Sequence, residues 1–114
     1  MNKERLAEIL VKHAAWRSGE RANLANENLA GHNFSGMDLY GVNLWGADLS
    51  EAHLVGVNLS CADMRRANLT GANLTDADLT GADLTDANFT DADLTNAKLS
   101  GALVKIGNIS RPIA

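Results

Sequence analysis

Few of the side chains that carry out chemistry occur in this sequence. His32 and His53 are candidate metal ligands, with Glu27 and Glu51 as candidate oxygen ligands. In the five-residue repeat that runs through the chain, His32 has an inward position and His53 the neighbouring outward one. Two ligands of opposite orientation are a poor start for a metal site, so we expect His32 to fill a wide first coil or to hydrogen-bond a capping helix. The sequence therefore predicts no metal and no other cofactor.

The sequence also lacks the motifs of nucleophilic catalysis and phosphate binding. Cys61 is the single cysteine, which excludes an internal disulfide. No His or Asp lies in its repeat unit to generate a thiolate. The glycines recur as corners and match neither G-x-x-x-x-G-K-[ST] nor a strand-to-helix G-x-G-x-x-G. We predict that the protein is not an enzyme; a catalytic pocket without a sequence motif is the alternative.

A five-residue repeat positions these side chains, and it is clearest in residues 67–101: ANLTG, ANLTD, ADLTG, ADLTD, ANFTD, ADLTN and AKLSG. Five residues advance an α-helix by about 500°, and an odd spacing changes the side of a strand, so neither element buries every fifth leucine. Within a unit, Ala and Leu are two apart and share one side of an extended chain. The residues that follow favour turns. Extended pieces separated by corners predict a solenoid.

The repeat is continuous over residues 22–106, which contain seventeen units. The central residue is apolar in all seventeen, the residue two before it is Ala in twelve, and the residue between them is Asn or Asp in fourteen. This pattern resembles the pentapeptide-repeat family, A-(D/N)-L-x-x. Spacing alone leaves the number of corners per coil open. The resemblance implies an all-β solenoid, a right-handed four-sided β-helix with about 20 residues per coil and about four coils.

Residues 1–20 lack the repeat and have helical spacing instead. Leu6, Ile9 and Leu10 fall on one side of an amphipathic helix. Because the end of a solenoid exposes apolar side chains and unpaired backbone, we predict that this helix caps the first coil. The alternative is a helix that binds a membrane surface or a partner.

The solenoid is expected to span residues 21–106, followed by a cap or tail at residues 107–114. The repeat decays there, and the tail either plugs the last coil or leaves that edge for a second copy of the chain. A homodimer through a coil end is therefore one expectation. Some members of the family that the repeat resembles pair end to end.

Charge and hydropathy limit the classes of partner. The net charge is −4 and the pI is about 5.2, which disfavours direct binding to nucleic acid because that needs basic charge. No apolar run approaches the length of a transmembrane helix, and no signal peptide is recognisable. We expect a cytoplasmic protein without a membrane partner.

Departures from the repeat on the outer surface are the candidate partner site. Side chains other than Ser or Thr occupy outward positions at Tyr40, Trp45 and Val55, and two adjacent outward positions are basic, Arg65 and Arg66. In the four-sided helix that the resemblance implies, Arg65 stacks directly on Trp45 and is expected to make a cation–π contact. Tyr, Trp and Arg are enriched at binding hot spots. The alternative is that the N-terminal helix folds back over some of these rings.

The second half of the repeat is acidic, and its aspartates are Asp76, Asp78, Asp83, Asp86, Asp91 and Asp93. Some pentapeptide-repeat proteins inhibit DNA gyrase by resembling DNA in shape and charge. These aspartates are spread over all four faces, however, and a rod of about 20 Å covers only about six base pairs. The leading hypothesis is a non-catalytic protein-binding or scaffold protein. The alternative is a DNA-mimic inhibitor of DNA gyrase or of another DNA-binding protein.

Overall fold

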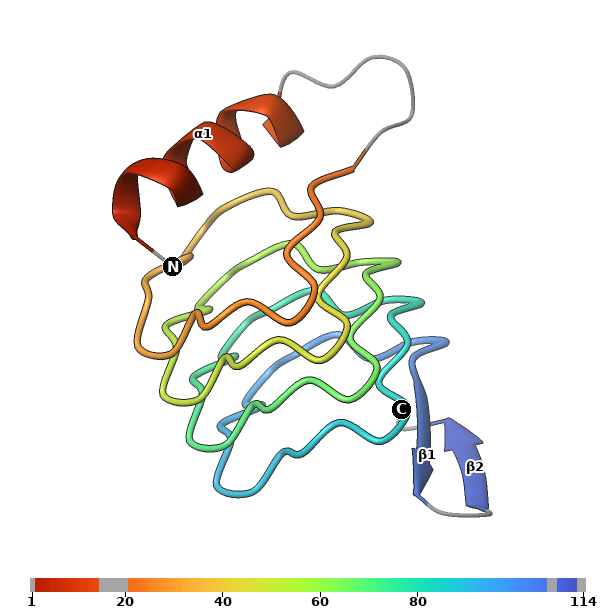
Figure 1. Ribbon diagram of the computed structural model, residues 1–114. Coiled ribbons are helices and arrows are strands. Elements are labelled where there is room, and N and C mark those ends of the chain that lie inside the picture. The colour runs from red at the N-terminus through yellow and green to blue at the C-terminus, as the bar shows by residue number, and fades with distance from the viewer. Residues whose placement is uncertain (1, 15–20, 107–108, 113–114) are drawn as a thin grey trace.

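A computed structural model describes residues 2–14, 21–106 and 109–112 of the chain. It contains one helix, α1 (Lys3–Ala14), and two strands, β1 (Leu103–Ile106) and β2 (Ile109–Pro112). From residue 21 to β1 the chain winds into a stack of coils (Figure 1).

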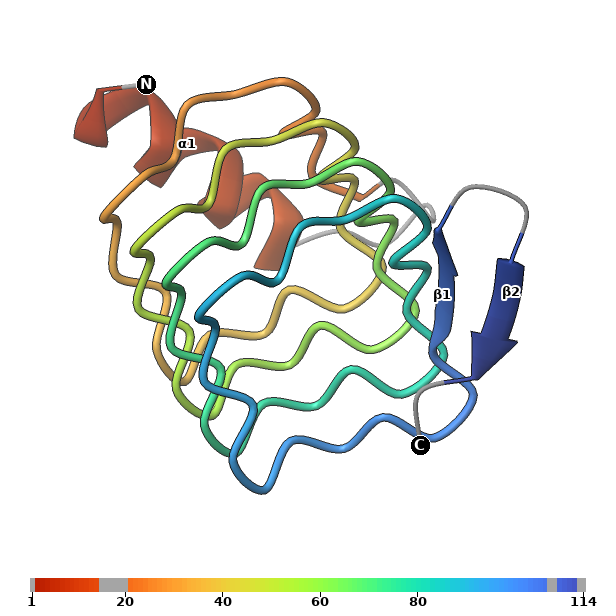
Figure 2. The same ribbon diagram turned by 90° about the horizontal axis from the view of Figure 1, so that it is seen from below.

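Each coil contains 20 residues. Parallel bridges join residues 20 apart along the whole stack, from Asn23–Asn43 to Asp83–Leu103. Every fifth residue from Asn26 to Gly101 has a positive φ between 57° and 72°. Four such corners in one period of 20 residues make a four-sided coil, which is visible along the axis of the stack (Figure 2). The corner spacing and the bridge spacing together confirm that the five-residue period describes a solenoid.

The chemistry of one repeat unit accounts for its corner. The N–H of Ala72 donates to the carbonyl of Leu69 (3.0 Å) across Gly71, whose φ is +68°. A positive φ at the third residue is what a type II turn requires. Before the corner, Oδ1 of Asn68 accepts hydrogen bonds from the N–H (3.0 Å) and the hydroxyl (2.6 Å) of Thr70. The Asn or Asp of the repeat therefore satisfies backbone that the corner would otherwise leave unpaired.

The core is a set of columns of Leu and Ala around the axis. Central residues such as Leu54 and Leu74 are fully buried, and Ala or Val fills the position two residues before them. The first coil differs, because Glu27, His32 and Met37 occupy three of its alanine positions. Glu27 and His32 are half-buried, and Met37 is 38% exposed, so His32 is not enclosed in the core.

The first coil is covered by α1, which lies across its end (Figure 1). Leu6 is buried in the same core cluster as the coils, and Ile9 and Leu10 pack against that cluster. These contacts place the apolar side of α1 where the spacing predicted it. Among the described residues, no helix is both long and apolar enough to cross a membrane.

The last coil is less enclosed. Phe89, Leu94 and Leu99 are only partly buried, whereas the matching residues of the earlier coils are fully buried. The strands β1 and β2 pair antiparallel as a hairpin, with Ile106 opposite Ile109. This hairpin lies beside the last coil and not across its end (Figures 1 and 2). Of the predicted tail, residues 107–108 and 113–114 lie outside the described residues.

Candidate functional site

The most distinctive surface feature is a tryptophan under an arginine. Trp45 follows a central leucine, so its position points outward at a corner. Its carbonyl accepts from the N–H of Asn26 (2.8 Å), and the next residue donates to the carbonyl of Arg65 (2.8 Å). Trp45 is thus held between two neighbouring coils and is half-buried. The guanidinium carbon of Arg66 lies 5.7 Å from the centre of its ring, within the range of a cation–π contact.

The prediction that Arg65 makes this contact is wrong, although Arg65 does stack on Trp45 through the backbone. Its guanidinium turns to Asp63 instead: Nε donates to Oδ1 (2.9 Å) and Nη2 to Oδ2 (2.8 Å). Residues two apart share one side of an extended chain, so this carboxylate is within easy reach. A two-point, charge-assisted pair also fixes the orientation of the guanidinium. The hydrogen bond from Arg65 lowers the pKa of the Asp63 carboxyl, against a smaller opposing effect of burial.

We call residues 25–26, 45–46, 65–66 and 85–86, which stack in one column, the Trp45 corner. Arg65 is half exposed and Asp63 about a third exposed, so solvent screens their ion pair and it contributes little to the free energy of unfolding. The main effect of the ion pair is to fix the orientation of the Arg65 side chain towards Asp63, so that Arg66 makes the contact with the Trp45 ring.

Tyr40 lies at the adjacent corner and makes a second contact of this kind. The guanidinium carbon of Arg21 lies 4.9 Å from the centre of the Tyr40 ring. Tyr40 is 40% exposed, so α1 does not cover it. A hydrogen bond with Cys61 raises the pKa of the Tyr40 phenol, and the charge of Arg21 opposes that effect. Sequence reasoning missed Arg21 because it precedes the first complete unit. In the structure Arg21 lies over Gly41, 20 residues later, where a Cβ would lie 2.7 Å from its Nε.

Val55 does not join the other predicted residues. It follows Trp45 by ten residues and precedes Arg65 by ten, which is half a coil, so it occupies the opposite corner. Its carbonyl accepts from the N–H of Gly36 in a separate column. The structure therefore brings together Trp45, Arg65 and Arg66, with Tyr40 one corner away.

The acidic residues fall into two groups. Asp78, Asp83 and Asp93 occupy the Asn/Asp position of the repeat and accept the backbone N–H of the Thr two residues later, at 3.0, 3.1 and 3.0 Å. Hydrogen bonds from the threonines lower the pKa of the Asp78 and Asp93 carboxyls. These aspartates have the same structural role as the asparagines at equivalent positions.

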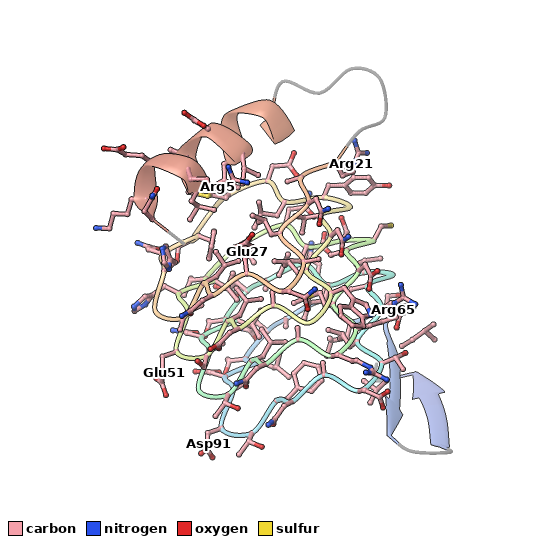
Figure 3. All side chains as sticks on the ribbon, viewed as in Figure 1. Arg5, Arg21, Glu27, Glu51, Arg65 and Asp91 are labelled. Atoms are coloured by element: carbon pink, nitrogen blue, oxygen red, sulfur yellow. The ribbon has the colours of Figure 1, made fainter. Side chains whose placement is uncertain are left out.

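Asp76, Asp86 and Asp91 are exposed at corners, where each has a φ near +60°. Asp76 and Asp86 are ten residues apart and so lie at opposite corners. Figure 3 shows Asp91 with Glu51 on one side of the molecule and Arg21 with Arg65 on the other. The negative charges therefore surround the rod and do not form one stripe.

Metal binding has no structural basis in the described parts of the chain. They contain no group of three or more His, Cys, Asp or Glu side chains that could hold a metal ion. His32 and His53 belong to neighbouring coils, and the N–H of His53 donates to the carbonyl of His32 (2.9 Å). The imidazole Nδ1 of His32 lies 3.3 Å from the carbonyl oxygen of Ala30.

Comparison with known proteins finds a family model and several solved structures. The model, described as pentapeptide repeats, matches eight copies over residues 20–56, 47–86 and 72–103. No curated protein gave a significant match.

A pentapeptide repeat protein from the thylakoid lumen of Arabidopsis thaliana is 42% identical, with a TM-score of 0.70 over 74% of this chain and 57% of that one. HetL, a pentapeptide repeat protein involved in heterocyst differentiation regulation in the cyanobacterium Nostoc, is 33% identical, with a TM-score of 0.55 over 82% of this chain and 45% of that one. This chain thus spans about half the length of these proteins. Their similarity implies the right-handed four-sided β-helix.

The plasmid-mediated fluoroquinolone resistance protein QnrB1 is 16% identical, with a TM-score of 0.26 over 75% of this chain and 65% of that one. At this level the likeness carries no argument about function. The cytoplasmic location stays a prediction, since the Arabidopsis protein comes from the thylakoid lumen.

Proposed function

The chain belongs to the pentapeptide-repeat family, and from that premise we propose that it is a non-catalytic binding protein that presents the Trp45 corner to a protein partner. The observation that carries this proposal is the stack of Arg66 on Trp45 beside the Arg65–Asp63 ion pair. Trp45, Arg65 and Arg66 depart from the uniform surface of the repeat, whereas Asp63 is the Asp that its unit is expected to have.

The corner is organised before any partner arrives. Trp45 is half-buried between coils, Arg66 lies on its ring, and two hydrogen bonds hold Arg65. Ordering a long side chain at an interface costs about 0.5 to 1.5 kcal/mol, and part of that cost is already met here. Trp and Arg are also the residues most often found at binding hot spots.

The charges of the corner indicate the chemistry of the partner. Asp63 neutralises Arg65, whereas Arg66 faces the ring and keeps the N–H donors along its edge. A guanidinium with free edges suits a planar, two-point contact with a carboxylate. We expect the partner to bring an aspartate or glutamate to Arg66 and an apolar group to the exposed part of Trp45.

The test compares two corners of one protein. Trp45→Ala and Arg66→Ala should each abolish or strongly reduce capture of the partner from lysate, identified by mass spectrometry. Val55→Ala, on the opposite half-buried corner, is the matched control and should capture it normally. Equal capture by folded Trp45→Ala protein would show that this corner is not the binding site.

A second candidate function is mimicry of DNA towards gyrase or another DNA-binding protein. What favours it is that Asp76, Asp86 and Asp91 are exposed and make no hydrogen bond through their carboxylates among the described residues. Their distribution around the rod argues against it. Changing all three to Asn, which tolerates a positive φ, removes three charges without disturbing the corners. A supercoiling assay should then show inhibition by the native protein and not by the triple variant; no inhibition by the native protein excludes gyrase.

We further propose that a second copy of the chain docks on the last coil. The partly exposed Phe89, Leu94 and Leu99 support this, because the same positions in earlier coils are covered by the next coil. Analytical ultracentrifugation should show a dimer whose formation is prevented by Leu94→Asp. A monomer at all concentrations would refute this part of the proposal.

A further inference from the structure

A partly open groove separates α1 from one side of the first coil. Its volume is about 520 Å³. One side of the helix and the corner after Leu29 line it, together with residues of the next two repeat units: Lys3, Leu6, Ala7, Leu10, Ala30, Gly31, His32, Asn33 and Met37. None of the surfaces used in the proposed function contributes to this groove.

The groove exists because the repeat changes here. His32 and Met37 stand where later coils have Ala or Val, and Ala30 stands where later coils have Ser or Thr. Side chains as large as His and Met do not fit beside the axis, and they lie at the rim of the coil, half-buried and 38% exposed respectively. Both side chains line the space between α1 and the coil.

The lining is mostly apolar, with three polar side chains, those of Lys3, His32 and Asn33. Leu6, Leu10 and Met37 supply apolar surface, and the ionisable residues of the lining are Lys3 and His32, with no carboxylate among the nine. The orientation of His32 is set from two sides. Its ring stacks on Phe34 (6.2 Å between centroids, 27° between planes), and its Nδ1 is in contact with a backbone carbonyl oxygen. This contact engages Nδ1 with the backbone, so Lys3 is the side chain of the lining that is placed to pair with an anion.

We propose that this groove binds a small amphipathic anion, a carboxylate or sulfonate carried on an apolar body. Lys3 would pair with the anionic group, and the leucines and Met37 would cover the apolar body. Sites for small ligands typically have volumes of about 300 to 1,000 Å³, mostly apolar walls and a few polar groups, and this groove has all three properties. One turn of a helix, about 10 Å wide and 5.4 Å long, fills roughly 400 Å³, so a partner helix would enter by little more than a turn.

The experiment uses the full chain, anilinonaphthalenesulfonate as a fluorescent anionic probe, and decanoate as competitor. We expect saturable binding of one probe per chain and displacement by decanoate, but at least about tenfold weaker displacement by decylammonium, which has the same apolar body and the opposite charge. Amide signals of Lys3, Leu6, His32 and Met37 should shift when decanoate is added.

Variants locate the site. Met37→Glu places a negative charge in the groove at an exposed position and should weaken probe and decanoate binding at least about tenfold. Ser100→Glu adds the same charge to an exposed residue of the last coil and should leave binding unchanged. Loss of probe binding in Leu94→Asp but not in Met37→Glu would assign the probe to the open coil end and overturn the proposal. Equal displacement by decanoate and decylammonium would overturn the choice of an anion.

Discussion

Leu74 and Leu94 give one core position in two environments, because they are 20 residues apart and stack directly. Leu74 is fully buried between coils, whereas Leu94 is partly exposed in the last coil. In Leu74→Ala the lost transfer energy adds to the cost of a cavity, so we expect a loss of about 3 to 4 kcal/mol in the free energy of unfolding. In Leu94→Ala solvent fills the space, so no cavity forms. Because Leu94 is only partly buried, we expect a loss of about 1 to 2 kcal/mol in the free energy of unfolding.

Urea unfolding measures both changes, followed by circular dichroism at low protein concentration. The midpoints of the two variants should differ while their slopes stay equal. The cost of Leu94→Ala should grow with protein concentration if a second copy covers this coil, because binding of the native state adds to its stability. Equal costs for the two substitutions at every concentration would show that the last coil is as enclosed as the third, and would refute both the open end and its docking role.

Three further predictions concern the corners and the first coil. Glu51→Gly should raise the free energy of unfolding by about 1 kcal/mol, since Glu51 has a φ of +57° and glycine adopts this region without a Cβ penalty; an unchanged urea midpoint contradicts it. The pKa of Asp63 lies below its unfolded value of 3.8, so its stabilising effect is complete well above pH 3.8 and fades as the pH falls through the lower, folded value. The stability difference between the native protein and Asp63→Asn should therefore shrink between pH 5 and pH 2, and a constant difference would argue against the ion pair. Leu6→Asp should detach α1 from the first coil, with faster amide exchange near Leu24 and a loss of about 2 to 3 kcal/mol; unaltered exchange there would mean that α1 does not cap the coil.

The repeat predicted the path of the backbone and the residues of the core, because in a solenoid the position of a residue within the repeat unit determines whether its side chain is buried. A residue that recurs every five positions has the same neighbours at each recurrence, so the leucine column of residues such as Leu54 and Leu74 could be assigned without coordinates. The 20-residue period also predicted that Arg65 stacks on Trp45, and the backbone hydrogen bond between these coils agrees.

The choice of side-chain contact could not be predicted from that period. Stacking places both Arg65 and Arg66 near the Trp45 ring, and the outcome depends on which guanidinium has a stronger partner nearby. Asp63, two residues before Arg65, supplies that partner. The position of Val55, in contrast, followed from simple arithmetic, since ten residues are half a coil.

The C-terminal hairpin had a sequence signal of its own. In the sequence, Gly107 and Asn108 stand between Ile106 and Ile109, and a Gly-Asn dipeptide between two strand-forming segments is typical of a β-hairpin. The expectation of a plug or an open edge followed the fading repeat and overlooked this local signal. β1 also explains why Leu103 can replace Asn or Asp: it still bridges Asp83, as the repeat requires, while pairing with β2.

In a solenoid of this kind, a residue that fits the repeat is already explained by its role in the coil. The aspartates show this best, because those at the Asn/Asp position accept the same hydrogen bond as asparagine does. Residues that the repeat does not require are therefore the best candidates for function. In this chain they concentrate in the first three coils, where Met37 and His32 line the groove and Arg66 of the third coil stacks on Trp45 of the second. The two proposed sites lie on different elements of that region, so a variant in one leaves the other intact.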